Sequence, residues 1–440
     1  MDADLTSLFI IVVAAFVCPA ISLSLPRRMI PETVFLLIAG MLLGPYVSNL
    51  VQSDAAIDLL SNLGLGFLFL LAGYEIDVRD ISGKGGRHGL LTWFISFAAA
   101  LAIAVPIGAT HENIQGGFAE AIILTTTAYG TLVPIMHSRG ITREDPIGKG
   151  ITEYGVWGEL CPVIALALLL TTRATWITVL LLLAFIAVSV IAGLVSKKLN
   201  AQGSKLDTLM KENAETNAQM SVRAVIILMV GLVTLSSLFD LDVVLGAFAA
   251  GFVLRVVIPK GDTSLEHKLN GIGYGFFIPL FFIVSGMKID PAGVIADPIV
   301  LIVSIVALLF RRSVPIFRSC NVRRDMKDVD ERSKGAIALY CATSLPLIVA
   351  VTSVAVKAGY MDQSIASALI AAGAITVFLM PLLATVVMHT IDADLGEACR
   401  EIRRHPRSTL AVLKKHRRLE RERNTKRRHH LRDSKKHRMK

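Results

Sequence analysis

Long apolar runs separated by short polar breaks fill the first 390 residues of this 440-residue chain. Most runs are about 17–25 residues long, the length that an α-helix needs to cross the hydrocarbon core of a bilayer. The pattern therefore predicts an all-α polytopic membrane protein with about thirteen transmembrane helices. The predicted spans are residues 5–25, 31–46, 57–75, 88–109, 117–136, 147–171, 174–195, 221–238, 241–258, 268–286, 295–317, 334–356 and 364–389.

Lysine and arginine residues are distributed unevenly between the loops of this layout. With the N-terminus outside, the loops on the inner side hold most of the basic residues, and the outer loops hold only Arg173, Lys288 and Lys357. Cytoplasmic loops of membrane proteins carry the excess of Lys and Arg. The distribution predicts an odd number of spans, an outside N-terminus and a cytoplasmic C-terminus, and we expect a bacterial cell membrane.

Composition narrows the class of protein further. Hydrophobic residues make up 53% of the chain, which excludes an ordinary soluble enzyme. The five cysteines show neither the spacing of a metal site nor a disulfide framework. We therefore predict no cofactor and no enzymatic activity.

The segment 391–440 is a strongly basic tail. Residues 397–440 hold eighteen of the 45 Lys and Arg residues, so the tail accounts for more than the whole net charge of +10. It is predicted to bind anionic lipid, at about 1 kcal/mol per basic residue near the surface, or to serve as a disordered orientation signal. Nucleic-acid binding is less favoured, because no aromatic residue is interleaved to stack on bases.

One acidic residue lies deep within an apolar span. Glu159 follows Gly158 in span 147–171, and apolar residues continue to Leu170. An ionisable side chain at the bilayer centre costs about 2.5–3.5 kcal/mol on insertion scales, and such residues usually face a bundle interior or a water-filled path. We expect Glu159 to bind a proton or a monovalent metal cation, Na⁺ or K⁺. The alternative is a structural carboxylate that pairs with a buried base.

Two spans carry signals for a break in the helix. In span 117–136, Pro134 has no N–H to donate to the carbonyl of Gly130, and in span 334–356 Ser344 and Pro346 stand close together. Each signal alone is typical of an ordinary proline kink. Broken membrane helices are tolerated where they line a cavity, and their ends bind ions. We expect the hydroxyl groups near the first break to complete the oxygen shell of a cation: Thr126, Thr127 and Thr131.

The positions of these signals indicate an inverted repeat. If residues 1–171 and 221–390 form two halves joined by span 174–195, the two breaks fall at equivalent positions, and an odd offset of seven spans inverts one half. Inverted repeats with matched broken helices are typical of secondary transporters that bind substrate near the midplane. The chain is thus predicted to hold one transmembrane domain, residues 1–390.

Pro162 and two arginines add candidate groups near Glu159. Pro162 lies four residues after Gly158, so the Gly158 carbonyl loses its helical donor and becomes a second candidate oxygen ligand. Arg311 and Arg312 lie in span 295–317. They either extend to the membrane interface, or one of them is an internal counter-charge for Glu159 or another buried acid. The acids at the ends of spans are weaker candidates, expected near the membrane edge: Glu75, Glu120 and Glu153.

Four stretches resemble the monovalent cation:proton antiporter-2 family: residues 30–45, 70–77, 245–251 and 279–287. The resemblance covers about residues 1–390. It implies a homodimer with a dimerisation domain and a mobile core around two crossed broken helices. The family's ion-binding acid lies in the sixth span, often as an aspartate after Asn, Gln or Asp, where this chain has Gly158-Glu159. The family's basic residue in the eleventh span matches Arg312, with Arg311 as the alternative.

These observations predict a secondary antiporter that exchanges Na⁺ or K⁺ for protons by alternating access. Glu159 would bind either ion but not both. One alternative is a sodium-coupled symporter of a small organic solute on a similar inverted-repeat fold. Another is a membrane scaffold whose basic tail recruits a partner such as the ribosome, for which Glu159 would be dispensable.

Overall fold

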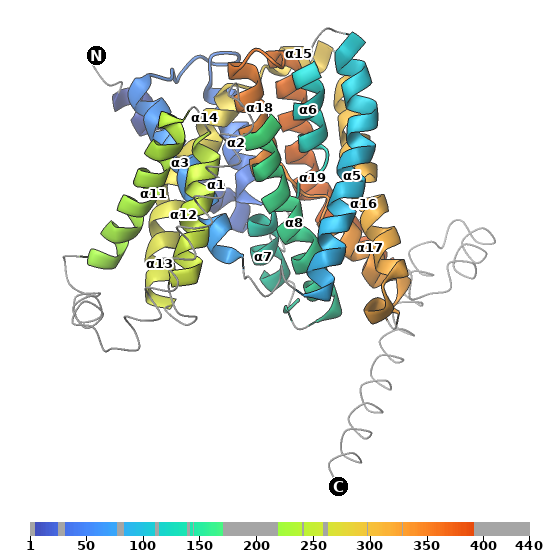
Figure 1. Ribbon diagram of the computed structural model, residues 1–440. Coiled ribbons are helices and arrows are strands. Elements are labelled where there is room, and N and C mark those ends of the chain that lie inside the picture. The colour runs from blue at the N-terminus through green and yellow to red at the C-terminus, as the bar shows by residue number, and fades with distance from the viewer. Residues whose placement is uncertain are drawn as a thin grey trace, which may run out of the picture.

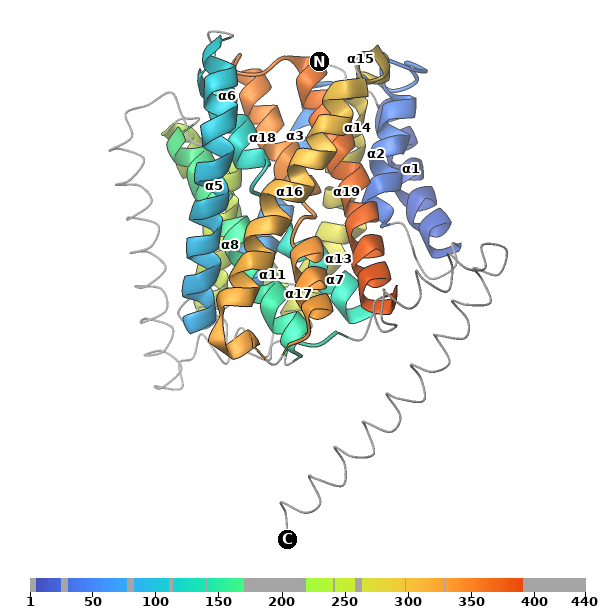
Figure 2. The same ribbon diagram turned by 90° about the vertical axis from the view of Figure 1, so that its right-hand side faces the viewer.

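The helices pack as two groups in a computed structural model of the chain (Figure 1, Figure 2). The structure describes residues 5–24, 31–76, 83–110, 114–138, 141–143, 145–169, 219–239, 242–257, 263–296, 298–327 and 329–390. Every described element is helical, as the all-α prediction requires. Span 174–195 and the basic tail lie outside the described residues.

The first group, here called the α3 group, packs around α3 and contains α12 and α14 as its nearest neighbours. Its members are α1 (Leu5–Ser24), α2 (Glu32–Leu43), α3 (Ala55–Glu75), α11 (Met220–Leu238), α12 (Val243–Val257), α13 (Thr263–Ile272) and α14 (Ile278–Met287). A Cβ atom on Gly251 of α12 would overlap the carbonyl oxygen of Leu70. Small residues at such points let membrane helices approach closely, and close approach supplies the packing energy that lipid-facing helices otherwise lack.

The second group, here called the α8 group, lies on the other side of the molecule in Figure 1. Its members are α5 (Lys84–Thr110), α6 (Ile114–Ile123), α7 (Tyr129–Ser138), α8 (Pro146–Leu169), α16 (Pro298–Val322), α17 (Glu331–Tyr340), α18 (Leu345–Lys357) and α19 (Gln363–Thr390). The short helix α15 (Pro291–Ala296) links the two groups along the chain. Among the described residues, the most direct helix packing between the groups is α3 on α7, α8 on α12, and α2 on α19.

Length and composition of the helices support the membrane assignment. In the described part of the chain, nine helices are long and apolar enough to cross a membrane, and three shorter apolar helices accompany them. Large apolar side chains such as Phe9, Phe16 and Ile227 point outward, as they do on a surface that faces lipid. Each predicted span other than 174–195 corresponds to a helix or a pair of helices, which confirms a polytopic all-α membrane protein.

The helices are broken in both spans where the sequence predicts it. α6 ends at Ile123 and α7 begins at Tyr129, while α17 ends at Tyr340 and α18 begins at Leu345. The two breaks contact each other, since the N–H of Ala128 donates to the carbonyl of Thr343 at 2.8 Å. Two broken helices therefore meet inside the α8 group, and their four ends converge there.

The first break lies earlier than the proline signal placed it. Gly130 and Pro134 both lie within α7, and the irregular backbone is the segment 124–128 before them. In the second break the positions agree, because Ser344 is the N-cap residue of α18 and Pro346 lies in its first turn. A proline in the first turn costs no hydrogen bond, so it starts a helix rather than ending one. The inversion of the two halves stays a prediction.

Candidate cation and proton site

Glu159 lies where α7 begins. Helix α8 carries the residue into the bundle, where it is only 4% exposed. Its Oε2 accepts the backbone N–H of Gly130 at 3.3 Å, and the N–H of Tyr129 also donates to the carboxylate. The free N–H groups and the dipole at a helix N-terminus favour a negative charge. The salt bridges among the described residues do not include Glu159.

Two of the predicted threonines satisfy carbonyl groups that the first break leaves open. The hydroxyl of Thr126 donates to the carbonyl of Ile123 at 2.7 Å and contacts the hydroxyl of Ser344 in the other break. The hydroxyl of Thr131 donates to the carbonyl of Ala128 at 2.9 Å. A hydroxyl that donates its proton keeps lone pairs that a cation can use. The structure thus brings Thr126 to the meeting point of the breaks, and Thr131 lies one turn into α7.

Thr127 ties together three separate elements. Its N–H donates to the carbonyl of Gly158 at 2.8 Å, and its hydroxyl donates to the carbonyl of Cys341 at 2.5 Å. The same hydroxyl accepts from Nε of Arg312 at 2.9 Å. The Gly158 carbonyl, which Pro162 deprives of its helical donor, is therefore not left open. It takes a donor from the neighbouring break instead.

Arg312 is inside the protein, but no acid accepts from it. The residue is 1% exposed, and its Nη2 donates to the carbonyl of Tyr154 at 2.8 Å. Its Nη1 has no hydrogen-bond partner among the described residues. A Cβ atom at position 158 would overlap Nη2, so Gly158 provides the space that the guanidinium occupies. The other candidate, Arg311, is half-buried and donates to the carbonyl of Ala99 at 2.8 Å.

A second carboxylate lies beside the start of α7. Glu75 ends α3, and its Oε2 is buried without a hydrogen-bond partner among the described residues. This oxygen is 3.6 Å from the place where a Cβ atom on Gly130 would stand, and the Glu75 and Glu159 carboxylates interact electrostatically. Sequence reasoning placed Glu75 near the membrane edge. The position of a residue at the end of a span does not reveal that the neighbouring helix is broken at the same depth.

A short π-helix faces the same region from the α3 group. The π-helix η2 (Gly273–Phe277) interrupts the predicted span between α13 and α14 and packs on α3. Its residue Tyr274 lies within electrostatic reach of Glu75, Glu159 and Glu32. Single-turn π-helices are frequent at functional sites. The tyrosine had no distinguishing signal in the sequence beyond the glycines on both sides of it.

Oxygen atoms dominate the chemistry of this region. Within the described ranges, no group of three or more His, Cys, Asp and Glu side chains gathers in one place. Glu75, Glu159 and the hydroxyls of the breaks are hard ligands, which suit hard cations better than soft transition metals. A carboxylate can also take up a proton, so the same atoms can bind either kind of ion.

Comparison with known families decides the classification. The family described as "Sodium/hydrogen exchanger, transmembrane" matches residues 12–389. The chain belongs to this family. The match confirms the expected resemblance to cation:proton antiporters, and it places the chain among transporters.

Individual relatives of the exchanger family match over much of the chain. A putative Na⁺/H⁺ antiporter of Bacillus subtilis (strain 168), YjbQ, is 27% identical over 402 residues, which are 86% of this chain and 62% of the relative. The Na⁺/H⁺-K⁺ antiporter GerN of Bacillus cereus is 22% identical over 369 residues, 80% of this chain and 88% of GerN. The chain spans 37% of the length of a third relative, the Na⁺/H⁺ antiporter NhaS5 of Synechocystis sp..

A solved structure shares the fold of this exchanger-family chain. The sodium proton antiporter MjNhaP1 from Methanocaldococcus jannaschii superposes with a TM-score of 0.56, covering 87% of this chain and 97% of MjNhaP1. The sequences are 16% identical, so this likeness concerns the fold alone.

Proposed function

We propose that this chain exchanges a monovalent cation, Na⁺ or K⁺, for protons across the cell membrane, with Glu159 as the shared site. The observation that carries the proposal is the placement of Glu159. Its carboxylate is buried at the N-terminus of α7, beside two touching helix breaks and beside Glu75. No basic side chain among the described residues forms an ion pair with it. Its relatives are described as Na⁺/H⁺ antiporters, and GerN as a Na⁺/H⁺-K⁺ antiporter.

Competition between the two ions produces the exchange. A buried, unpaired carboxylate is costly, and either a proton or a cation cancels its charge. The loaded α8 group therefore moves past the apolar barrier more easily than the empty one. A carrier that moves only when loaded exchanges one ion for the other and does not leak.

The two helix groups provide a route for this motion. Glu159 belongs to the α8 group and Glu75 to the α3 group, so a cation held by both carboxylates lies between the groups. In the described part of the chain, most direct packing between the groups comes from a few helix pairs, which is compatible with sliding. Movement of the α8 group against the α3 group then exposes the site to one side of the membrane at a time.

The test is proton flux in vesicles that contain the purified full-length protein. Adding Na⁺ or K⁺ outside acid-loaded vesicles should cause proton movement with wild-type protein, and Glu159→Gln should abolish it. Glu159→Asp keeps the charge and should retain part of the flux. Full exchange by Glu159→Gln would remove Glu159 from the mechanism. A Na⁺-driven flux that requires an added organic solute would instead identify a symporter.

The assembly and orientation follow as parts of the same proposal. We expect a homodimer in the bilayer, with the N-terminus outside, the C-terminus cytoplasmic and the basic tail on anionic lipid. Cysteine labelling of the tail residue Cys399 tests the orientation. A membrane-impermeant maleimide should react in inside-out vesicles and not in right-side-out vesicles.

A further inference from the structure

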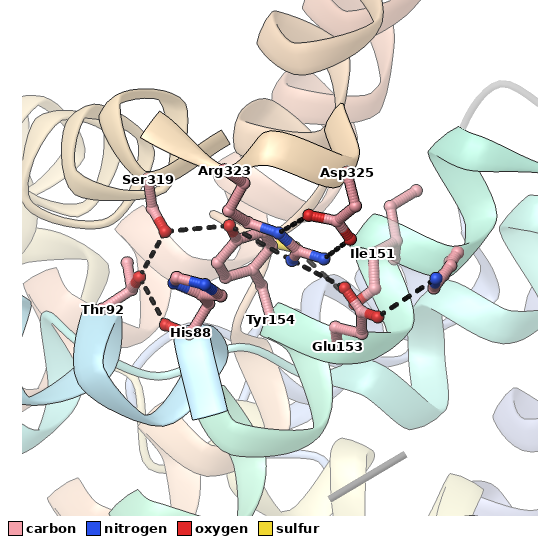
Figure 3. A network of polar contacts seen from close by, with 10 residues as sticks. His88, Thr92, Ile151, Glu153, Tyr154, Ser319, Arg323 and Asp325 are labelled. Carbon is pink, nitrogen blue, oxygen red and sulfur yellow. Dashed lines mark hydrogen bonds and ion pairs between the residues drawn. The ribbon is translucent and has the colours of Figure 1, made fainter. Parts of the chain in front are cut away.

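A second polar cluster lies at the C-terminal end of α16 (Figure 3). Its centre is the guanidinium of Arg323, whose side chain is fully buried. Nη1 of Arg323 lies 2.6 Å from Oε2 of Glu153 on α8, and Nη2 lies 2.6 Å from Oδ2 of Asp325 in the 3₁₀-helix η3 (Arg324–Met326). Exchange at Glu159 makes no direct use of these residues.

Tyr154 and two hydroxyl residues extend this cluster to α5. The hydroxyl of Tyr154 is 3.5 Å from Nη1 of Arg323 and 2.9 Å from the hydroxyl of Ser319 on α16. The hydroxyl of Thr92 on α5 donates to Ser319 at 2.8 Å. Figure 3 shows these side chains converging from three helices. We call Arg323, Glu153, Tyr154, Asp325, Ser319 and Thr92 the Arg323 cluster.

One guanidinium lies between two carboxylates in the cluster. Burial alone lowers the pKa of the Arg323 guanidinium, but its hydrogen bonds to Asp325, Glu153 and Tyr154 outweigh burial and raise that pKa. The hydrogen bond from Arg323 lowers the pKa of the Asp325 carboxyl below its usual range. Arg323 and Asp325 therefore both stay charged at neutral pH, and their ion pair persists there.

Helices α8 and α16 depend on side chains for their relative position. α16 packs along α5, α17 and α19, and its backbone has little direct packing with α8. Two arginine side chains from the α16 region connect α16 to α8. Arg323 reaches the Glu153 carboxylate and the Tyr154 hydroxyl, and Arg312 reaches the Tyr154 carbonyl. The two arginines thus contact consecutive residues of α8, Glu153 and Tyr154.

Helix α5 closes the cluster from the third side. A Cβ atom on Gly85 of α5 would overlap the carboxylate of Glu153. A Cβ atom on Gly89, one turn further along, would overlap the carbonyl of Glu153. The backbone of α5 therefore lies against Glu153, and the carboxylate has little room to turn away from Arg323.

The bridges continue from the cluster to the cation site. Arg312, which donates to the Tyr154 carbonyl, also donates to the hydroxyl of Thr127. The N–H of Thr127 donates to the carbonyl of Gly158, the residue before Glu159. A change in the distance between α8 and α16 therefore moves Arg312, and with it the break that presents the start of α7 to Glu159.

We propose that Arg323 and Glu153 are positioning residues, a strut between α16 and α8 that sets the cation affinity of the Glu159 site. The inference rests on the proposed exchange function. Partners that orient ligands from outside the site commonly contribute about 10–100-fold to ion affinity. A loss of the strut should therefore change the cation concentration needed for half-maximal exchange. A role in folding alone would lower the amount of protein and the maximal rate without changing that concentration.

The experiment measures exchange against Na⁺ and K⁺ concentration for full-length variants in vesicles. Arg323→Gln and Glu153→Gln should each raise the half-saturating concentration about 10-fold. Arg323→Lys keeps the charge and should restore a value nearer wild type. The matched control is Glu331→Gln, which removes the exposed partner of buried Lys334 on α17, an ion pair of 2.9 Å. Among the described residues, no ion pair or hydrogen bond joins this pair to the Arg323 cluster. It should leave half-saturation unchanged.

The outcomes separate the two levels of inference. Absence of exchange by wild-type protein with either cation would overturn the proposed function itself. Exchange by wild type, with unchanged half-saturation and only lower maximal rates in both Gln variants, would overturn the strut. If those variants do not fold, Tyr154→Phe removes only the hydroxyl that joins Arg323 to Ser319. An unchanged half-saturating concentration in folded Tyr154→Phe protein would likewise contradict the inference.

Discussion

Glu159 and Arg312 are both buried near the two breaks, yet each charge is held by different groups. Backbone N–H groups of α7 hold Glu159, whereas Thr127 and the Tyr154 carbonyl hold Arg312. Burying an unpaired ion costs several kcal/mol, and a helix N-terminus offsets up to about 2 kcal/mol. The helix N-terminus therefore offsets only part of the cost of burying the charge, and a bound proton or cation at Glu159 would offset the rest. An ion pair between Glu159 and an arginine would have balanced the charge without a bound ion.

Gly158 has a steric role that can be tested directly. A side chain at this position would overlap Arg312 Nη2 and would lie 2.5 Å from Thr127 Oγ1. Because the surroundings are fully packed, Gly158→Ala should lower stability by about 1–3 kcal/mol. The measurement is thermal unfolding in detergent. Gly231→Ala on α11 is the control, since no atom lies within 4 Å of its Cβ position, and it should be neutral or slightly stabilising. Equal effects of both substitutions would contradict this role.

Glu75 should contribute to cation binding more than to the exchange step. Its buried Oε2 has no partner among the described residues and shares the start of α7 with Glu159. Glu75→Gln should therefore raise the half-saturating cation concentration about 10-fold or more while Glu159 still exchanges. Flux measured against cation concentration gives both quantities. An unchanged concentration would show that Glu75 is not a ligand.

At the scale of elements, the two breaks act as one unit. Each break leaves backbone groups without helical partners, and those groups would be costly in an apolar bundle. Here one break supplies donors to the other: Ala128 to Thr343 through the backbone, and Thr127 to Cys341 through its hydroxyl. Because polar groups of each break find their hydrogen-bond partners in the other break, the two broken helices should move together.

A double-mutant cycle measures this dependence. Thr126 and Ser344 contact each other across the two breaks. The effects of Thr126→Ala and Ser344→Ala on the half-saturating cation concentration should be non-additive by about twofold or more, which corresponds to a coupling of about 0.5 kcal/mol. In the control cycle, Thr125→Ala replaces Thr126→Ala. Because the Thr125 hydroxyl bonds within α6, its effect should add to that of Ser344→Ala. Additivity in both cycles would contradict coupling.

Sequence reasoning found the spans that the structure describes and the two broken ones among them because both depend on local signals, although Pro134 marked the first break too late in the chain. Apolar length defines a span, and a proline near hydroxyl residues marks irregular backbone. The partners of Arg312 and the depth of Glu75 depend on which helices become neighbours, and no local pattern encodes that. Glu153 illustrates the same limit. Its expected position near the membrane edge stays a prediction, whereas its burial against the Arg323 guanidinium of a distant segment had no local signal.

At the scale of the whole molecule, one end of the boundary between the helix groups is bridged. The amide of Gln363 at the start of α19 donates to the carbonyl of Lys288 after α14 at 2.6 Å. Nearby, the N–H of Asp290 donates to the hydroxyl of Ser367 at 3.2 Å. α14 belongs to the α3 group and α19 to the α8 group. These bonds therefore hold the two groups together at that end and must break if the groups move apart.

A reversible cross-link at this boundary should stop exchange. We expect Asp290→Cys with Ser367→Cys, in a Cys399→Ser background, to form a disulfide under oxidation, because the short side chain of Ser367 contacts the backbone N–H of Asp290. The described native cysteines are buried and should not compete. Oxidation should remove most of the flux, and reduction should restore it. Each single cysteine variant should stay active under the same oxidant. If protein shown by mass spectrometry to be fully cross-linked still exchanged at the wild-type rate, the groups would not need to separate at this end, and alternating access would require motion elsewhere.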